Sequence, residues 1–200
     1  MMKRFEVLRA LPEGYSSVYR LTIDSREVLI KLNLYGLALW GVGYALFAGY
    51  SSLLYASHLV KGPDPLQGSR LVSILIGFFI MLSIHELIHG LAFQYFGAKP
   101  RYGFSLQKAV AYASAKGYYL TRDAYIIVGL APLVVITIAS MLLMLVFSGD
   151  THYVIGFIGA ANIGGCIGDV WFYLVCRQYP PTLLAQDYGD GAELYAPSQF

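Results

Sequence analysis

Charged residues are scarce in this chain of 200 residues: Asp, Glu, Lys and Arg together make up 13% of it, against about a quarter in ordinary soluble domains. Hydrophobic residues make up 57% and fall into long blocks. So few charges between long apolar blocks predict a single-domain integral membrane protein. The net charge of +2 is too small to indicate a nucleic-acid partner, so none is expected.

Cysteines are also few. Cys166 and Cys176 lie in an apolar stretch without CxxC spacing, which excludes a disulfide framework and a thiolate metal site. The N-terminal segment, residues 1–31, carries charges throughout and has no early apolar run, unlike a cleaved signal peptide. Within it, residues 18–23 and 28–30 could form a β-hairpin.

Four apolar blocks are long enough to cross a bilayer, at about 20 residues per crossing. The expected fold is therefore an all-α polytopic membrane protein with about four transmembrane helices and short β-hairpin elements on the cytoplasmic side. The polar insert at residues 98–122 alternates in polarity and predicts such a hairpin, with its turn at Lys116-Gly117. A polar, irregular cytoplasmic tail is expected at residues 179–200. The predicted spans are residues 32–57, 71–97, 123–147 and 151–177, within a transmembrane domain of residues 32–178.

Lys and Arg are distributed unequally between the two ends of these spans. Most of the 14 lie in the N-terminal segment and in the insert at residues 98–122. Cytoplasmic loops are enriched in these residues, so the chain is expected in the cell membrane as a multi-pass protein with both termini cytoplasmic.

The run His-Glu-Leu-Ile-His at residues 85–89 lies inside the second predicted span. On a helix, His85 and His89 project from one face and can share one tetrahedral zinc ion. Glu86 lies beside them and can take a proton from a water molecule that zinc activates. The alternative is a hydrogen-bonded polar cluster that holds helices together, but such a cluster has no need for this spacing.

A catalytic zinc usually has a third protein ligand. Asp169 is the acidic residue well inside a predicted span, and at 1.5 Å per residue it lies about 27 Å below the outer end of its helix. The same estimate gives about 21 Å for His85 and 27 Å for His89, so the three are roughly level. His152 would lie near the outer rim, too far away. The alternative for Asp169 is a buried carboxylate that hydrogen-bonds neighbouring helices.

Asn162 lies seven residues before Asp169 and hence on nearly the same helix face. It could contact a substrate backbone or an oxyanion, or bond another helix. Glycines near it predict close approach of another helix or a metal site. These glycines are Gly156, Gly159, Gly164, Gly165 and Gly168.

Pro132 should kink the third span, and no catalytic role is assigned to it.

The His-Glu-x-x-His run in a membrane helix, the basic insert and the Asp169-bearing fourth span resemble the site-2 protease class of intramembrane metalloproteases. More closely, the sequence resembles a small bacterial family described as putative zincin peptidases, over roughly residues 32–178. This resemblance implies that His85, His89 and Asp169 are zinc ligands and that Glu86 is the general base, facing the cytoplasmic half of the membrane. One departure is that Asn162 is followed by Ile-Gly-Gly, where site-2 proteases carry Asn-x-x-Pro.

The expected function is that of a zinc-dependent intramembrane metallopeptidase, with Zn²⁺ as cofactor and a membrane protein or peptide in the lipid bilayer as substrate. The hairpin at residues 101–120 could hold an extended substrate by strand addition. The main alternative is a membrane zinc-binding or transport protein without hydrolytic activity. Others are a zinc hydrolase that acts on a lipid or prenylated peptide, and a pseudo-enzyme that holds partners. The oligomeric state is left open.

Overall fold

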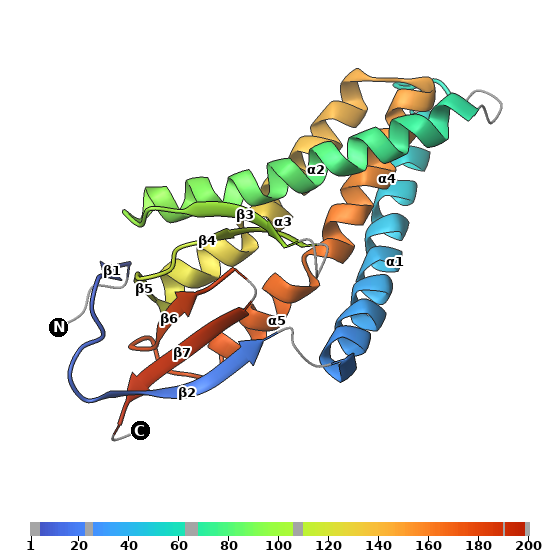
Figure 1. The fold of residues 1–200 in the computed structure, drawn as a ribbon. Coiled ribbons are helices and arrows are strands. Elements are labelled where there is room, and N and C mark those ends of the chain that lie inside the picture. Colours follow the sequence, from blue (N-terminus) through green and yellow to red (C-terminus); the bar gives the residue numbers. More distant parts are fainter. Residues whose placement is uncertain (1–4, 23–25, 63–67, 106–109, 190, 199–200) are drawn as a thin grey trace. The chain divides into compact units, whose positions relative to one another are not determined.

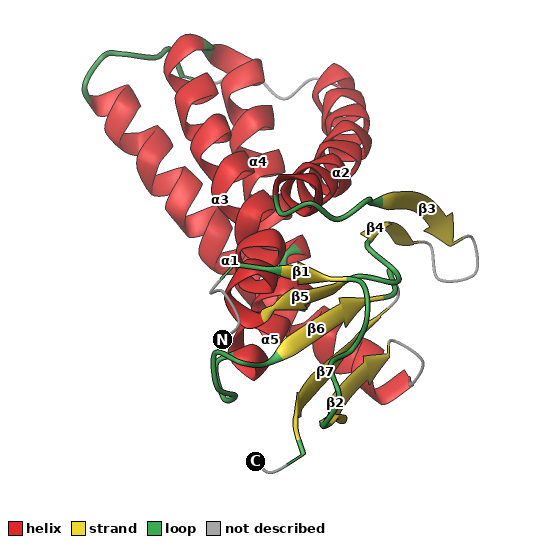
Figure 2. Cartoon of the chain, turned by 90° about the vertical axis from the view of Figure 1, so that its left-hand side faces the viewer, coloured by secondary structure: helices red, strands yellow, loops and turns green. Residues whose placement is uncertain are grey.

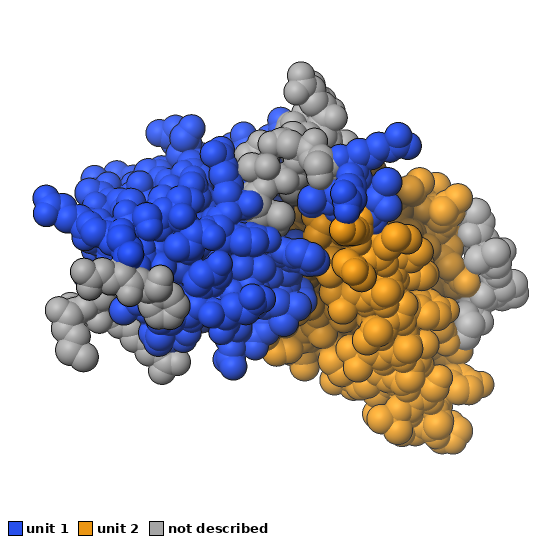
Figure 3. Space-filling view, turned by 90° about the horizontal axis from the view of Figure 1, so that it is seen from below, with its two compact units in different colours: residues 1–30, 86–131, 168–200 blue, residues 31–85, 132–167 orange. Residues whose placement is uncertain are grey.

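The computed structural model describes residues 5–22, 26–62, 68–105, 110–189 and 191–198. Its elements divide into two compact units, coloured separately in Figure 3. The first unit comprises residues 1–30, 86–131 and 168–200, and the second comprises residues 31–85 and 132–167. Figure 1 labels the elements, which are β1 (Val7–Leu8), β2 (Tyr15–Thr22), α1 (Arg26–Ala56), α2 (Gly68–Tyr95), β3 (Arg101–Ser105), β4 (Val110–Ser114), β5 (Tyr119–Thr121), α3 (Arg122–Val146), α4 (Gly149–Gly165), α5 (Ile167–Cys176), β6 (Leu184–Asp187) and β7 (Gly191–Pro197).

Among the described residues, α1, α2 and α3 are each long and apolar enough to cross a membrane. A fourth crossing is possible if α4 and α5 count as one span, but this pair is bent by 41°. The fourth span, predicted as continuous over residues 151–177, is therefore broken. Many large apolar side chains on these helices are exposed, as expected for a surface that faces lipid. These features suggest a membrane protein.

The second unit is a helical bundle whose close contacts are made at glycines. A Cβ atom at Gly159 of α4 would lie 2.5 Å from the Phe47 ring of α1, and one at Gly164 would lie 2.7 Å from Trp40. Only small residues allow helices to approach so closely. A Cβ atom at Gly165 or Gly168, which were also expected to serve close approach, would meet no atom of the described neighbouring residues within 4 Å. The core between these helices consists of Phe47, Leu54, Val60, Met144, Ala160 and Ile163.

The first unit contains an antiparallel sheet of five strands in the order β1-β5-β6-β7-β2 (Figure 2). In β7 buried and half-buried residues alternate, so one face of the strand packs on the core. That face contributes Ala192, Leu194 and Ala196, which pack with apolar residues of α3 and α5. A separate two-stranded sheet is formed by β3 and β4.

The strands correct three sequence predictions. Residues 179–200 are not an irregular tail, since they contain β6 and β7. The N-terminal hairpin is wrong: β2 pairs with β7, residues 28–30 belong to α1, and residues 23–25 lie outside the described residues. The insert does form a hairpin, but by pairing β3 with β4, whereas β5 joins the five-stranded sheet. The fold is thus mostly helical, with more strand structure than expected.

Candidate metal centre

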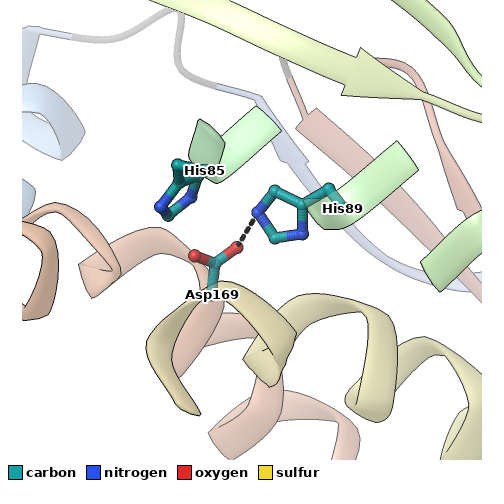
Figure 4. A group of neighbouring side chains, drawn as sticks. All are labelled: His85, His89 and Asp169. Carbon is teal, nitrogen blue, oxygen red and sulfur yellow. Dashed lines mark ion pairs between the residues drawn. The ribbon is translucent and has the colours of Figure 1, made fainter. Parts of the chain in front are cut away.

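Three ligating side chains come together at the His-Glu-x-x-His run (Figure 4). His85 and His89 lie one turn apart on α2, and Asp169 lies in the first turn of α5. One ligand atom from each lies within 4.8 Å of the other two, and His89 Nε2 is 3.4 Å from Asp169 Oδ1. Zinc–ligand bonds of 2.0–2.1 Å at tetrahedral angles place neighbouring ligands about 3.3 Å apart. The donor set and the 3.4 Å between His89 and Asp169 therefore fit a zinc ion.

The break between α4 and α5 explains where Asp169 lies. The helix ends at Gly165 and restarts at Ile167, so Asp169 lies in the first turn of a new helix. A carboxylate is stabilised there by the helix dipole. Its side chain is 21% exposed and that of His89 is 11% exposed, so both are shielded from solvent without being sealed from it.

His89 is oriented by a backbone carbonyl. Its Nδ1 lies 2.9 Å from the carbonyl oxygen of Val128 in α3. A carbonyl only accepts hydrogen bonds, so Nδ1 carries the proton and the lone pair of the neutral ring is on Nε2, which points at Asp169. Val128 lies four residues before Pro132, which has no N–H to donate to it. The proline thus makes this carbonyl available to His89.

His85 is oriented by Asn162. Its Nδ1 lies 3.0 Å from Asn162 Oδ1, and Asn162 Nδ2 donates to the carbonyl oxygen of Pro132 at 3.3 Å. Asn162 is fully buried. Since its amide nitrogen points at Pro132, its oxygen faces His85 and accepts the Nδ1 proton, which puts the lone pair of His85 on Nε2. Both histidines therefore have the partner on their other ring nitrogen that metal-ligating histidines usually have.

Glu86 is held by the hairpin. Its Oε2 accepts a hydrogen bond of 2.6 Å from the backbone N–H of Ala113 in β4. Among the described strands β4 pairs only with β3, and since the Ala113 N–H bonds Glu86 and not β3, it lies on the outer edge of the strand. That edge therefore faces the carboxylate that was predicted to be the general base.

This hairpin is positioned in the first unit by two contacts, in each of which an aromatic ring packs on a glycine. A Cβ atom at Gly90, directly after His89, would overlap the hydroxyl group of Tyr102 in β3. A Cβ atom at Gly189 would lie 2.5 Å from the ring of Tyr112 in β4. Gly189 also has a positive φ of 92°, which favours glycine. One strand of the hairpin therefore packs against α2 beside the ligands, and the other packs against the turn that follows β6.

The sequence was compared with models of known protein families, and one of them matches this chain. The model described as "Putative zincin peptidase" matches residues 78–184, more than half of the chain. The chain belongs to this family. Membership in the zincin peptidase family implies zinc and suggests a metallopeptidase, and the matched residues include His85, Glu86, His89 and Asp169. No curated protein and no solved structure matches the chain.

The structure thus brings together the three predicted ligands, and Glu86 follows His85 directly. It places Asn162 against His85, which favours an orienting role; the predicted contact with substrate or an oxyanion stays a prediction. Sequence reasoning missed the roles of Val128 and Pro132. The signal was present, since a proline inside a helix always removes the N–H partner of the carbonyl four residues earlier.

Proposed function

We propose that this protein is a zinc-dependent intramembrane metallopeptidase that cleaves peptide bonds of membrane-associated substrates. The observation that carries the proposal is the group His85, His89 and Asp169 with Glu86 next to it on α2. Family membership supports peptidase chemistry. The placement of this run on an apolar helix of membrane-spanning length, and the resemblance in layout to site-2 proteases, support cleavage within the bilayer.

Each side chain has a distinct task. His85, His89 and Asp169 would hold the zinc ion, which polarises the substrate carbonyl and activates a water molecule when it is bound. Glu86 takes a proton from the attacking water and passes it to the leaving amine. A carboxylate has two oxygens, so one can keep the bond to the Ala113 N–H while the other carries the proton. Asn162 and the Val128 carbonyl keep the two imidazoles in the orientation that directs Nε2 inward.

The open edge of β4 is suited to present the substrate. A peptide must be extended to expose its scissile bond, and an extended segment can add to a strand edge through main-chain hydrogen bonds. The Ala113 N–H on that edge already bonds Glu86 at 2.6 Å, so a substrate strand would pair with the backbone groups of β4 on either side of it. A substrate strand paired here would therefore run beside the catalytic base.

The proposed reaction takes place in the cytoplasmic half of the membrane, with both termini in the cytoplasm. This orientation rests on the unequal distribution of Lys and Arg between the two ends of the spans. Epitope tags at the two termini, probed in cells with and without permeabilisation, test it. Tags that are accessible from outside would overturn it.

Metal analysis of the purified protein tests the site itself. The wild-type protein should contain one zinc ion per chain, and His85→Ala and Asp169→Ala should lower the occupancy strongly. Full zinc occupancy in Asp169→Ala would remove Asp169 as a ligand. No zinc in the wild-type protein would overturn the proposed function.

Replacing Glu86 distinguishes a peptidase from a zinc carrier. Glu86→Gln keeps a hydrogen-bond acceptor for Ala113 but cannot take up the proton, so turnover should fall about 10²–10⁴-fold while zinc occupancy is retained. A carrier would keep its transport rate in this variant. The measurement is the rate at which the wild-type protein cleaves a membrane-tethered peptide library. Glu86→Gln is the control.

A further inference from the structure

The second unit contains a partly open cavity of about 370 Å³ that has no residue in common with the metal centre. Its size lies within the range of about 300–1,000 Å³ that is typical of small-molecule sites. Ile74, which lines the cavity, and His85, in the metal centre, both lie on α2 and are separated by about 16 Å along the helix axis, at 1.5 Å per residue. The lining residues come from four helices and are Tyr44, Phe47, Ala48, Ser51, Ser52, Tyr55, Arg70, Ile74, Met144, Tyr153, Val154, Gly156 and Phe157.

The cavity is amphipathic along its length. On α1 its lining runs from Tyr44 to Tyr55, a rise of about 16 Å, with apolar Phe47 and Ala48 nearer Tyr44 and the hydroxyl-bearing Ser51 and Ser52 nearer Tyr55. At one end lies Arg70, where the apolar stretch of α2 begins. Arginine at the end of a membrane helix lies at head-group level, whereas Ile74 lies one turn deeper. The cation Arg70 would thus lie at the depth of a lipid's head group, and the apolar side of the cavity would lie at the depth of its acyl chain.

Arg70 is held in place by an ion pair. Its Nη2 contacts Oδ1 of Asp150, in the first turn of α4, and Asp150 does not line the cavity. Among the described lining residues, Arg70 carries the only formal charge. A guanidinium has five N–H donors in a planar fork, so it can bond Asp150 and a phosphate oxygen at once.

A buried serine supplies a hydrogen-bond acceptor in the same cavity. His152 Nδ1 lies 2.9 Å from the carbonyl oxygen of Met144, which only accepts, so in the neutral ring Nε2 is the acceptor. Ser51 Oγ, 2.9 Å from that Nε2, must therefore donate its proton to His152. The lone pairs of Ser51, which is 6% exposed and lines the cavity, can then accept a hydrogen bond from a ligand.

We propose that this cavity binds a lysophospholipid, a single-chain lipid that carries a phosphate and a free hydroxyl group. The phosphate would bond Arg70, the hydroxyl would donate to Ser51, and the one chain would lie along Phe47 and Ile74. A fatty acid matches these groups less well, since its carboxylate has no proton to offer Ser51. A diacyl phospholipid also matches less well, since its second glycerol hydroxyl is esterified and has no proton to offer Ser51.

Photolabelling of the full chain in phospholipid nanodiscs tests the proposal. The two probes are a diazirine-bearing lysophospholipid and a diazirine-bearing fatty acid of equal chain length. The lysophospholipid should label peptides of α1 or α4, and the fatty acid should label them about tenfold less, the difference expected for one lost hydrogen bond in a buried site. Equal labelling by the fatty acid would overturn the proposal.

Two variants and one matched control locate the label. Ala48→Phe fills the cavity from α1, and the double variant Arg70→Gln/Asp150→Asn removes the cation without leaving an unpaired carboxylate. Each should lower labelling about tenfold or more. Ala45→Phe adds the same side chain at an exposed position of α1 outside the lining and should leave labelling unchanged. Unfolding temperature and zinc content identify any variant that fails to fold, and labelling that is equal in Ala48→Phe and Ala45→Phe contradicts the proposal.

Discussion

Pro132 lacks the N–H that would bond the carbonyl oxygen of Val128, and His89 Nδ1 lies 2.9 Å from that oxygen. The same proline offers its own carbonyl to Asn162, which orients His85. A proline inside a helix costs about 3 kcal/mol or more, so its presence here needs a compensating gain. The geometry supplies one, because both histidines depend on the backbone around Pro132.

Replacing Pro132 by Ala should therefore weaken zinc binding while it stabilises α3. The new N–H would compete with His89 for the Val128 carbonyl, and loss of such a partner typically lowers metal affinity about 10–100-fold. Restoring the helical hydrogen bond should raise the unfolding temperature. Chelator competition and thermal unfolding in detergent measure the two effects. Val128→Ala is the control: it keeps the carbonyl, so its zinc affinity should match the wild type, and equal affinity in Pro132→Ala would contradict the proposed role.

Asn162→Leu tests the partner of the other histidine. Leucine fills a similar volume but offers no oxygen to His85 Nδ1, so the imidazole loses its fixed orientation. We expect zinc affinity to fall about 10–100-fold. Asn162→Asp keeps an acceptor for His85 and should retain more zinc than the leucine variant, as measured by metal titration. If both variants bind zinc like the wild type, Asn162 has no orienting role.

The ligand group could be predicted from the sequence because its information is local and periodic. Two histidines four residues apart on a helix define one face, and counting the helical rise placed Asp169 at the same depth. The orienting groups could not be found this way, since Val128 acts through its backbone and its role depends on which helix packs beside α2. Only the fold brings such groups together.

The strands show a different limit. In β7 the apolar residues Ala192, Leu194 and Ala196 alternate with Glu193 and Tyr195. This period of two is present in the sequence and is typical of a half-buried strand. The polar and acidic composition of the segment nevertheless predicts an irregular tail. Its strand partner β2 lies 169 to 182 residues away along the chain, a pairing that no local pattern reveals.

The polar face of this sheet predicts a pH dependence of stability. Ser17 of β2 donates a hydrogen bond of 2.6 Å from its Oγ to the carboxylate of Glu193 in β7. This hydrogen bond lowers the pKa of Glu193 from its usual value of 4.5. A lowered pKa in the folded state stabilises the protein above about pH 4.5, and this contribution is lost as the pH falls through the folded-state pKa. Ser17→Ala should therefore lower the unfolding temperature at about pH 7 but much less at about pH 3. Unfolding curves of both proteins at the two pH values provide the measurement, and a difference that is independent of pH would contradict it.

Gly90 allows a test of whether the hairpin position governs catalysis separately from metal binding. In Gly90→Ala the added methyl group would overlap the Tyr102 hydroxyl, so the half-exposed Tyr102 ring must move and β3 loses this contact with α2. The hairpin should then move the Ala113 N–H relative to Glu86, and a displacement of about 1 Å at a catalytic group can cost about 100-fold in rate. His85, His89 and Asp169 do not belong to the hairpin, so zinc affinity should be unchanged.

The matched control is Gly129→Ala in helix α3, where the added methyl group would meet no atom within 4 Å in the part of the chain that the structure describes. It should keep both the zinc affinity and the peptidase rate. Peptide cleavage assays beside chelator competition separate the two quantities for each variant. A Gly90→Ala protein that cleaves at the wild-type rate would show that the contact between Tyr102 and α2 does not set the position of the base, whereas one that loses zinc as well would show that the hairpin supports the ligands themselves.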